Sequence, residues 1–582
     1  MRSSFPAPAF SPVKYKAQVS NGSWWADVVL LGLVVLVGGL VFHGLDQMNQ
    51  PLGVLDSSPL SLDLIHLPEY TLRTTLRMFI ALFASFVFSL VVATLAAKSR
   101  KAAVVILPAL DILQSVPVLG FLTFTVVFFM GLFPGKETGV ECAAIFAIFT
   151  SQVWNMTFSV YQSLKTVPHD LYDVSRQFGF SPWQRFVRLE LPFATPGLVW
   201  NMMMSMSGGW FFVVASEAIT VGNTTVSLPG IGSWLALAIE QKNIAAIAWA
   251  VLAMAVAIKL YDLLFFRPIV AWADKFRFEQ TAAQKRPRSR IHDLLRSTRL
   301  VPLVLLASRE IKFSLRLDKL PALPRIRFET SARFNRAIDR AWLALVAVAC
   351  TAGILQLAQF IGTTLGLGDV VDAFGLGLAT MLRVAVLIVL ASLVWVPVGV
   401  WIGLNPRWAE RLQPIAQWLA AFPANVLFPF AVVAIVALKL NPDIWLSPLM
   451  ILGTQWYILF NVIAGASALP TDLREAARSF HVRGWQWWRQ VALPGVFPYY
   501  VTGALTAAGG SWNASIVAEA VSWGDQHVYA SGLGAYIAQA TAAGDLRRVA
   551  LGVLVMSIFV VGFNRLLWRP LYGFAERRLR ID

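Results

Sequence analysis

The chain is 582 residues long, 57% hydrophobic and only 14% charged, with 22 Trp and 39 Phe. Soluble domains do not have this composition, which excludes an ordinary soluble enzyme or binding domain. The formal net charge is +16, but the excess Lys and Arg flank apolar segments, where they set topology and contact anionic lipid. We therefore expect the lipid bilayer as a partner and no nucleic acid.

Apolar segments of about 20 residues, the length that crosses the hydrocarbon layer, recur along the whole chain. They predict an all-α polytopic membrane protein with twelve spans, six in each half of the chain. The predicted spans lie near residues 26–43, 76–97, 104–132, 140–162, 197–221, 244–266, 342–363, 378–403, 412–438, 444–466, 498–522 and 549–568.

The distribution of basic residues predicts which way the spans run. Arg2 and Lys14 precede the first span, and Lys98 and Arg100 follow the second, whereas the loop between these spans begins with acidic residues. Because Lys and Arg accumulate on the cytoplasmic side of a membrane, both chain ends are predicted to be cytoplasmic.

The sequence repeats itself about halfway along. Trp210 and Glu217 return 302 residues later as Trp512 and Glu519, and a repeat of this kind decides architecture before local patterns do. The chain is therefore predicted to hold two homologous membrane domains in tandem. The predicted parts are a cytoplasmic tail at 1–25, a first domain at 26–280, a basic cytoplasmic linker at 281–335 and a second domain at 336–582.

The linker is rich in Lys and Arg, but apolar residues such as Leu294, Leu295 and the run 300–306 interrupt the basic ones. We expect part of it to lie on the inner membrane face as a basic amphipathic segment. A disordered tether is the alternative interpretation.

Two polar segments, residues 168–192 and 470–494, occupy equivalent places in the repeat and both fall on the predicted cytoplasmic side. Each pattern indicates a short helix, a turn and a second amphipathic helix, and the spacing of Asp472 and Glu475 predicts a capping box. Each short helix has one apolar stripe on an otherwise charged surface, which predicts a partner that covers it. The stripes are Leu171, Val174 and Phe178 in the first copy and Leu473, Ala476 and Phe480 in the second.

These segments resemble the cytoplasmic EAA loop of ATP-binding-cassette importer permeases, in which Glu-Ala-Ala, a following Gly and a final Leu-Pro mark the helix that docks into the ATPase. The second EAA-like loop has Glu475-Ala476-Ala477 and Leu493-Pro494, but His481 stands where Gly is expected. The first EAA-like loop keeps Gly179 and Leu191-Pro192 but has Asp173-Val174-Ser175. The resemblance implies ATPase coupling by Asp170, Leu171, Asp173, Arg176, Phe178 and Gly179, and by Asp472, Leu473, Glu475, Ala476, Ala477, Arg478 and Phe480.

Charged side chains inside spans are costly and indicate function by default. Glu217 and Glu519 lie in the fifth span of each half, seven residues after Trp210 and Trp512, so each Trp and Glu share a helix face. One interpretation is a translocation path lined by these four residues. The other is that each Glu bonds to a neighbouring helix or lies near the outer surface.

Other polar residues in the spans are weaker candidates for the path, since most polar residues in helical bundles join helices. These candidates are Gln152, Asn155, Gln455 and Asn461. Arg77 and Arg383 are expected to be snorkelling anchors near the outer ends of the second spans.

No catalytic group of residues is evident. The six His residues are dispersed without metal-ligand spacing, and Cys142 and Cys350 lie in apolar segments, so neither a metal site nor a disulfide is expected. The segment 131–137 contains an incomplete P-loop. The chain is therefore predicted to be no enzyme, to hold no cofactor of its own and to depend on a separate subunit for any ATP hydrolysis.

Beyond the loops, the Trp and Glu of the fifth spans and the following Gly230-x-Gly232 and Gly532-x-Gly534 resemble the nitrate, sulfonate, taurine and bicarbonate branch of importer permeases. The resemblance implies that one chain forms the whole transmembrane unit for a small solute, an anion such as nitrate, sulfonate, taurine or bicarbonate, in the bacterial inner membrane. It also implies two ATPase subunits that bind ATP and Mg inside, and a periplasmic solute-binding protein outside.

The alternative is a twelve-span secondary transporter, which would share the long basic central loop. Against it, Lys98-Ser99-Arg100-Lys101 after the second span lacks the Gly- and Asp-bearing signature expected there. Secondary carriers also have no need for two EAA-like loops.

Overall fold

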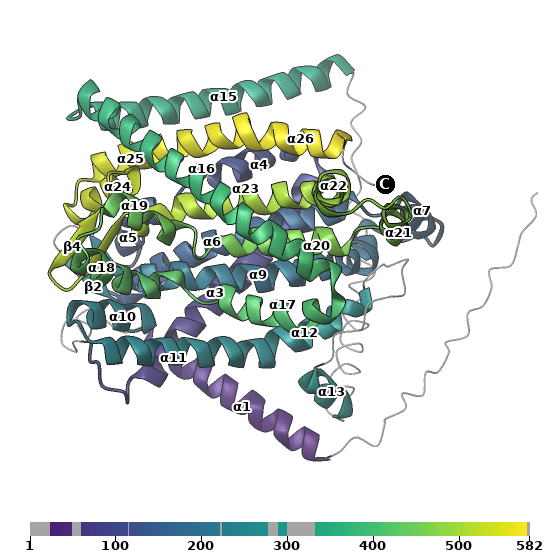
Figure 1. Ribbon diagram of the computed structural model, residues 1–582, viewed down its shortest axis with the longest axis horizontal. Helices are drawn as coiled ribbons and strands as arrows, with labels where there is room; N and C mark the ends of the chain where they lie inside the picture. Colours follow the sequence, from purple (N-terminus) through teal and green to yellow (C-terminus); the bar gives the residue numbers. More distant parts are fainter. Residues whose placement is uncertain are drawn as a thin grey trace, which may run out of the picture.

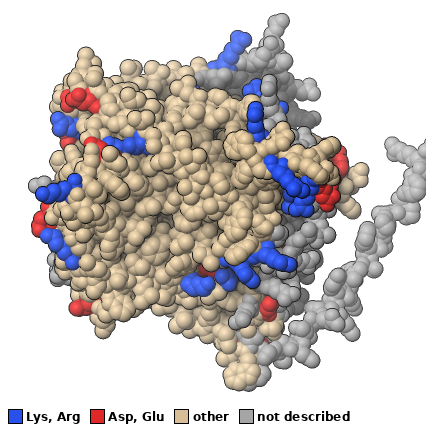
Figure 2. All heavy atoms as spheres, viewed as in Figure 1, with Lys and Arg blue, Asp and Glu red and all other residues tan. Residues whose placement is uncertain are grey.

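The computed structural model describes residues 24–48, 60–114, 116–221, 224–276, 289–298 and 332–578. The described chain is almost entirely helical, and long helices from both halves run alongside one another in one bundle (Figure 1). Charged side chains gather toward the two ends of this bundle and leave a largely uncharged face between them (Figure 2). The predicted all-α membrane fold is confirmed, with two short β-hairpins added.

The elements of the first half are α1 (Trp24–Gln47), α3 (Leu67–Lys98), α4 (Arg100–Leu113), η1 (Val118–Phe121), α5 (Leu122–Leu132), α6 (Glu137–Lys165), α7 (His169–Gln177), α8 (Pro182–Arg185), η2 (Phe186–Glu190), α9 (Leu191–Glu217), β1 (Ala218–Val221), β2 (Thr224–Ser227), α10 (Ile231–Glu240), α11 (Ile244–Tyr261), η3 (Asp262–Phe266), α12 (Arg267–Ala273) and η4 (Asp274–Phe276).

Helix α13 (Arg290–Ser297) follows, and the second half repeats the order of the first. Its elements are α15 (Ala332–Gly362), α16 (Leu367–Leu404), α17 (Pro406–Ala420), η6 (Ala424–Leu427), α18 (Phe428–Ala437), α19 (Pro442–Trp445), η7 (Ser447–Met450), α20 (Gln455–Ser467), α21 (Thr471–Ser479), α22 (Gly484–Trp487), η8 (Trp488–Ala492), α23 (Leu493–Ala518), β3 (Ala520–Trp523), β4 (Gln526–Tyr529), α24 (Leu533–Ala542), α25 (Leu546–Phe563), η9 (Asn564–Trp568) and α26 (Arg569–Arg578).

The predicted tail at 1–25 and most of the linker at 281–335 lie outside the described residues. Within the linker the structure describes residues 289–298 and the beginning of α15. Helix α13 packs against α12 and α1. The membrane-surface hypothesis for the rest of the linker stays a prediction.

By length and composition, eight helical segments of the described chain can cross a membrane, and two bent helix pairs bring the number to ten. The bent pairs are Arg407–Ala420 with Ala424–Ala437, at 73°, and Pro442–Met450 with Gln455–Ser467, at 45°. The remaining two of the twelve predicted spans fall on shorter apolar helices, Asp27–His43 and Val118–Leu132. The expected count of twelve full-length spans is thus too high, although each predicted span overlaps helix in the described chain.

The third span of each half is broken at a proline. Pro117 precedes η1 with φ −68° and ψ 113°, and Pro423 precedes η6 with φ −69° and ψ 118°. Proline supplies no backbone N–H and clashes with the preceding turn, so the helix stops and restarts in a new direction. The sequence reads as one apolar segment because hydropathy does not register this change of direction.

The fifth spans are shorter than predicted. Helix α9 ends at Glu217 and α23 at Ala518, so the prediction that these spans continue to 221 and 522 was wrong. The chain turns there into hairpins in which β1 pairs antiparallel with β2 and β3 with β4. Residues such as Val521 and Val528 of the second hairpin are apolar, but β-branched side chains favour extended backbone.

At the interface between the two halves, the broken third span of each half contacts the fifth helix of the other half. In each half a central helix packs between two others: α6 between α3 and α9, and α20 between α16 and α23. The backbone N–H of Val118, in η1, donates to Asn513 Oδ1 of α23 at 2.8 Å. Asn425 Nδ2, in η6, donates to Phe211 O of α9 at 3.4 Å. Helices α9 and α23 therefore lie at the interface between the halves.

Gly232, in the first turn of α10, sets the distance between α10 and the end of α9. A Cβ here would lie 2.6 Å from Val214 O and 2.8 Å from Val214 Cα, closer than packed atoms allow. We expect Gly232→Ala to lower the free energy of unfolding by about 1–3 kcal/mol, as overpacking does, measured by thermal unfolding in detergent. Gly509→Ala is the matched control, because a Cβ there meets nothing within 4 Å; equal losses from both variants would contradict this assignment.

Candidate functional site

A fully buried carboxylate, that of Glu217, stands at the end of the fifth helix of the first half. It accepts hydrogen bonds from Thr74 Oγ1 at 2.7 Å, from Arg77 Nη1 at 2.6 Å and from the backbone N–H of Gly232 at 2.6 Å. Arg77 also donates twice to the Glu141 carboxylate, both at 2.6 Å. These bonds join α3, α6, α9 and α10 at one point.

The second half builds the same arrangement around Glu519. Its carboxylate accepts from Thr380 Oγ1 at 2.9 Å, from Arg383 Nη1 at 3.0 Å and from the backbone N–H of Gly534 at 2.8 Å. Arg383 Nη2 pairs with Asp443 Oδ1 at 2.8 Å, and Asp443 is the repeat equivalent of Glu141. A network that occurs twice with the same roles is a feature of the fold.

The expectation that Arg77 and Arg383 are snorkelling anchors was wrong. The Arg77 side chain is 0% exposed and that of Arg383 only 13%, and both bind carboxylates of other helices. A basic residue near the end of an apolar segment resembles an anchor in sequence. The acidic partners lie 60 or more positions away along the chain, so only the fold brings them together.

Of the two interpretations for Glu217 and Glu519, the geometry favours bonds to neighbouring helices, because every contact described above joins helices. Trp210 is also fully buried, and its Nε1 donates to Tyr261 Oη at 3.0 Å. The place of these residues on a translocation path stays a prediction.

A cavity of about 190 Å³ lies at the interface between the halves. Among its described lining residues none is charged, and the polar ones carry amide or hydroxyl groups. The cavity is lined by Gln114, Val118, Thr150, Ser151, Trp154, Asn155, Phe212, Tyr457, Leu505, Thr506, Ala508, Gly509, Gly510, Trp512, Asn513, Val560, Phe563, Asn564 and Trp568. We call this cavity the neutral chamber.

Of the polar candidates predicted for the path, Asn155 and Trp512 line the neutral chamber and the others do not. Gln152 Nε2 lies 3.8 Å from Met206 Sδ. Gln455 Oε1 accepts from Trp395 Nε1 at 2.8 Å, and Asn461 Nδ2 donates to Tyr457 O at 2.8 Å. Bonds within and between helices thus account for Gln455 and Asn461.

The neutral chamber has polar groups that are not used by the protein. Within the described residues, the side-chain amides of Gln114, Asn155 and Asn564 and the hydroxyl of Tyr457 make no hydrogen bond to another protein group. Sequence reasoning missed Tyr457 and Asn564. Comparison of the repeats could have found Asn564, since it stands where the first half has Asp262.

The repeat also differs at the tryptophans. Tyr261, which accepts the bond from Trp210, is replaced by Phe563 in the second half, so Trp512 Nε1 is buried and has no hydrogen-bond partner in the part of the chain that the structure describes. Trp568, which replaces Phe266, has a buried Nε1 that is also unpaired. An unpaired buried N–H costs about 1–3 kcal/mol, and both indoles line the neutral chamber. The second half therefore has two unpaired indole N–H groups beside this cavity, whereas the equivalent Trp210 of the first half is paired.

The two EAA-like loops lie beyond the ends of the long helices at the same end of the bundle, where α7 and α21 are seen at the right of Figure 1. Phe178 is 72% exposed and Phe480 is 81% exposed, while Leu171 and Leu473 are half-buried. The first residue of each apolar stripe thus packs against the bundle, and the last residue is exposed.

The predicted capping box at Asp472 and Glu475 was wrong. Helix α21 begins at Thr471 after Pro470, which has extended backbone and gives no side-chain cap. Asp472 therefore lies in the first turn, where its charge complements the helix dipole. A capping box does occur in the first EAA-like loop, at Ser181 and Gln184 at the start of α8.

The first EAA-like loop is tied to the bundle by charge. Lys98 Nζ of α3 lies 2.7 Å from Glu190 Oε2, and Tyr172 Oη donates to Glu190 Oε1 at 3.4 Å. Burial, and then the Glu190 carboxylate, raise the pKa of the Tyr172 phenol above its ordinary value. The repeat equivalents of Lys98 and Glu190 are Leu404 and Ala492, so the second loop has no such tie.

Comparison with known families shows the class of protein. The model of the binding-protein-dependent transport system inner membrane component matches the chain twice, at residues 85–270 and 395–580. The chain therefore belongs to this family and contains two permease domains in tandem, as the repeat predicted.

Individual relatives are similar over one domain's length. The nitrate import permease protein NrtB of Leptolyngbya laminosa is 28% identical over 204 residues, which are 35% of this chain and 68% of the relative. The bicarbonate transport system permease protein CmpB of Synechococcus elongatus is 31% identical over 147 residues, 25% of this chain and 51% of the relative. The chain thus matches about half the length of the bicarbonate relative. The resemblance to importer permeases is confirmed, and a secondary transporter is not favoured.

The buried ion pairs predict unequal losses when their arginines are removed. Arg77→Leu leaves two buried carboxylates without their cation, and we expect a loss of about 3–5 kcal/mol in unfolding free energy, typical of a broken buried pair. Arg383→Leu should cost less, because Asp443 has a side chain that is 43% exposed and water can solvate it.

Thermal unfolding in detergent compares the two variants. The double variant Arg77→Leu with Glu217→Gln, which removes one of the stranded charges, should recover part of the loss. Equal destabilisation by the two arginine variants would contradict the difference in burial.

Proposed function

We propose that this chain forms the complete transmembrane unit of an ATP-driven importer in the bacterial inner membrane. The solute is small, an anion such as nitrate, sulfonate, taurine or bicarbonate, and a periplasmic binding protein delivers it. Two ATPase subunits, which bind ATP and Mg, dock on the two EAA-like loops, and both chain ends lie in the cytoplasm. The observation that carries the proposal is the pair of loops, exposed at one end of a bundle with the permease repeat.

Exposed aromatic side chains on the loops support a docking role. Trp183 is 54% exposed and Trp485 is 74% exposed, in addition to Phe178 and Phe480 described above. Large aromatic residues are costly to leave in water and are enriched at protein interfaces. The charged residues around them, Asp173, Arg176, Glu475 and Arg478, supply a polar rim to each contact.

The coupling between ATP and transport follows from this placement. Each loop continues directly into the fifth helix of its half, α9 or α23, through the π-helical segments η2 and η8. Movement of the ATPase subunits therefore displaces the helices that border the interface between halves. Such coupling requires the loops to bind each ATPase state with a different free energy.

The neutral chamber is the described cavity that fits a solute path. It lies between α6 of the first half and α23 and α25 of the second, and its free amides can donate to an oxyanion without a buried Lys or Arg. Neutral donors hold an anion less tightly than a charged group does. Weak retention suits a path from which the solute must leave.

The neutral chamber predicts a transport defect without a coupling defect. We expect Asn564→Leu to lower the rate of solute uptake in reconstituted vesicles roughly tenfold. The variant removes an amide that could bind the solute, and the larger side chain narrows the chamber. Basal ATPase activity of the complex should change less than twofold. Unchanged uptake by this variant would show that Asn564 does not belong to the solute path.

The two EAA-like loops predict unequal coupling. Glu475 belongs to the complete Glu-Ala-Ala motif, whereas the first loop has Asp173 and its own tie through Glu190. We therefore expect Glu475→Ala to reduce stimulation of the partner ATPase more than Asp173→Ala, by roughly threefold to tenfold, about the value of one charge-assisted hydrogen bond. ATP hydrolysis by the purified complex measures it.

Equal effects of the two variants would contradict the asymmetry, but not the docking. Docking itself is tested by co-purification of the ATPase subunit with the chain in detergent. Solute uptake by the lone chain, driven by protons and without a nucleotide-hydrolysing subunit, would overturn the proposed function.

A further inference from the structure

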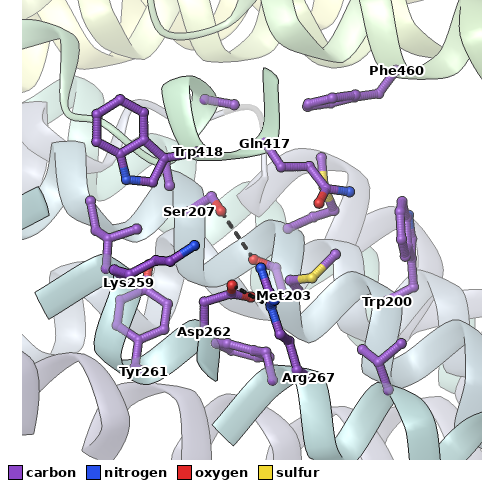
Figure 3. A pocket seen from close by; sticks show the side chains of 16 residues that line it. Trp200, Met203, Ser207, Lys259, Tyr261, Asp262, Arg267, Gln417, Trp418 and Phe460 are labelled. Atoms are coloured by element: carbon purple, nitrogen blue, oxygen red, sulfur yellow. Dashed lines mark hydrogen bonds and ion pairs between the residues drawn. The ribbon is translucent and has the colours of Figure 1, made fainter. Parts of the chain in front are cut away.

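A second and larger cavity, of about 390 Å³, lies at the other interface between the halves. The first half contributes the middle of α9, the end of α11, η3 and α12, and the second half contributes the end of α17 and Phe460 of α20 (Figure 3). Helix α12 continues from α11 toward the end of the bundle that carries the loops (Figure 1), so the part of the cavity lined by Arg267 and Val270 lies toward that end.

This cavity is the repeat counterpart of the neutral chamber. Met203, Ser207, Tyr261 and Phe266 line it, and their equivalents Leu505, Gly509, Phe563 and Trp568 line the neutral chamber. The two cavities therefore occupy the same place in the two halves, and the differences in their linings are differences of side chain.

Charge is the main difference. Lys259, Asp262 and Arg267 line the larger cavity. Asp262 Oδ2 lies 2.9 Å from Arg267 Nε, so these two charges offset each other. Within the described residues Lys259 has no ion pair or hydrogen bond. Figure 3 shows its side chain extending across the cavity toward the middle, which leaves one positive charge uncompensated.

The fold does not require this charge. The repeat equivalent of Lys259 is Val561, and that of Asp262 is Asn564, and the neutral chamber forms with both. The lysine is therefore particular to one of two equivalent cavities, which is expected of a binding group and not of a structural one.

The rest of the lining suits an anion with an apolar part. Trp200, Met203 and Phe460 provide apolar walls, and the side-chain amide of Gln417 makes no hydrogen bond to another described group. Basic cavities between membrane helices at the cytoplasmic end bind the headgroups of anionic lipids. Lys259 and Gln417 can donate to phosphate oxygens while the aromatic walls contact an acyl chain.

We propose that the cavity around Lys259 is a binding site for a phosphate or similar oxyanion, present in only one of the two halves. The group comes either from an anionic phospholipid of the inner leaflet or from a free oxyanion in the cytoplasm. Bound there, it contacts α9 and α11 of the first half and α17 of the second, so it stabilises the arrangement of the halves in which this cavity exists.

Native mass spectrometry of the purified full chain tests the lipid source, with phosphatidylglycerol as the probe and phosphatidylcholine as the neutral comparison. Titration calorimetry with inorganic phosphate tests the free oxyanion. We expect Lys259→Val, which copies the second half, to reduce the bound probe roughly fivefold to tenfold, the value of one such contact. Lys259→Arg should retain binding.

Lys165→Val is the matched control, because Lys165 is an exposed lysine at the end of α6 whose ammonium lies over the Tyr161 ring at 5.9 Å. Size-exclusion chromatography checks that each variant is folded, and Lys259→Gln replaces the Val variant if that one aggregates. If the Lys259 variants lose binding of phosphatidylglycerol alone, the ligand is a lipid headgroup. If they lose binding of phosphate alone, it is a free oxyanion. Equal binding by the wild-type chain and the Lys259 variants in both arms, or equal loss in Lys165→Val, overturns the proposal.

Discussion

The buried carboxylate at the end of each fifth helix is the interaction on which the rest of each half depends. A charge in an apolar bundle is stable only with partners, and Glu217 finds them on α3 and at the start of α10, with Arg77 extending the network to α6. The same residue fixes the hairpin that follows, since its backbone carbonyl accepts from Leu228 N, as that of Glu519 does from Ala530 N. One residue in each half thus determines where four helices meet and where the chain turns.

Apart from these two shared networks, the halves differ in several side chains. Tyr261 and Phe563, Asp262 and Asn564, and Lys259 and Val561 are repeat pairs that differ in charge or hydrogen bonding. In an assembly of two identical chains every such change would appear on both sides. Joining two domains in one chain allows one interface to carry a neutral cavity and the other a cationic one. It also allows one EAA-like loop to be tied to the bundle through Lys98 and Glu190 while the other is not.

Much of the architecture was predictable because its signals are local. Apolar segments predicted the long helices of the bundle but not α10 and α24, the 302-residue repeat predicted two domains, and the EAA-like loops predicted the family that the comparison confirmed. The neutral chamber was predictable only in part: Asn155 and Trp512 were named, whereas Tyr457 and Asn564 were not. Those two residues acquire their place from the packing of one half against the other, which no local pattern records.

The sequence by itself determined the helices, the tandem repeat and the exposed loops, because hydropathy, periodicity and motif spacing are properties of neighbouring residues. Only the tertiary structure decided that Arg77 and Arg383 are buried partners of Glu217 and Glu519, that the fifth spans end in hairpins, and that equivalent cavities differ in charge. The buried ion pairs depend on side chains separated by 60 or more residues that meet in a medium of low dielectric constant. In that medium the free energy of a charge is set by its partners in space, and the order of residues along the chain does not identify them.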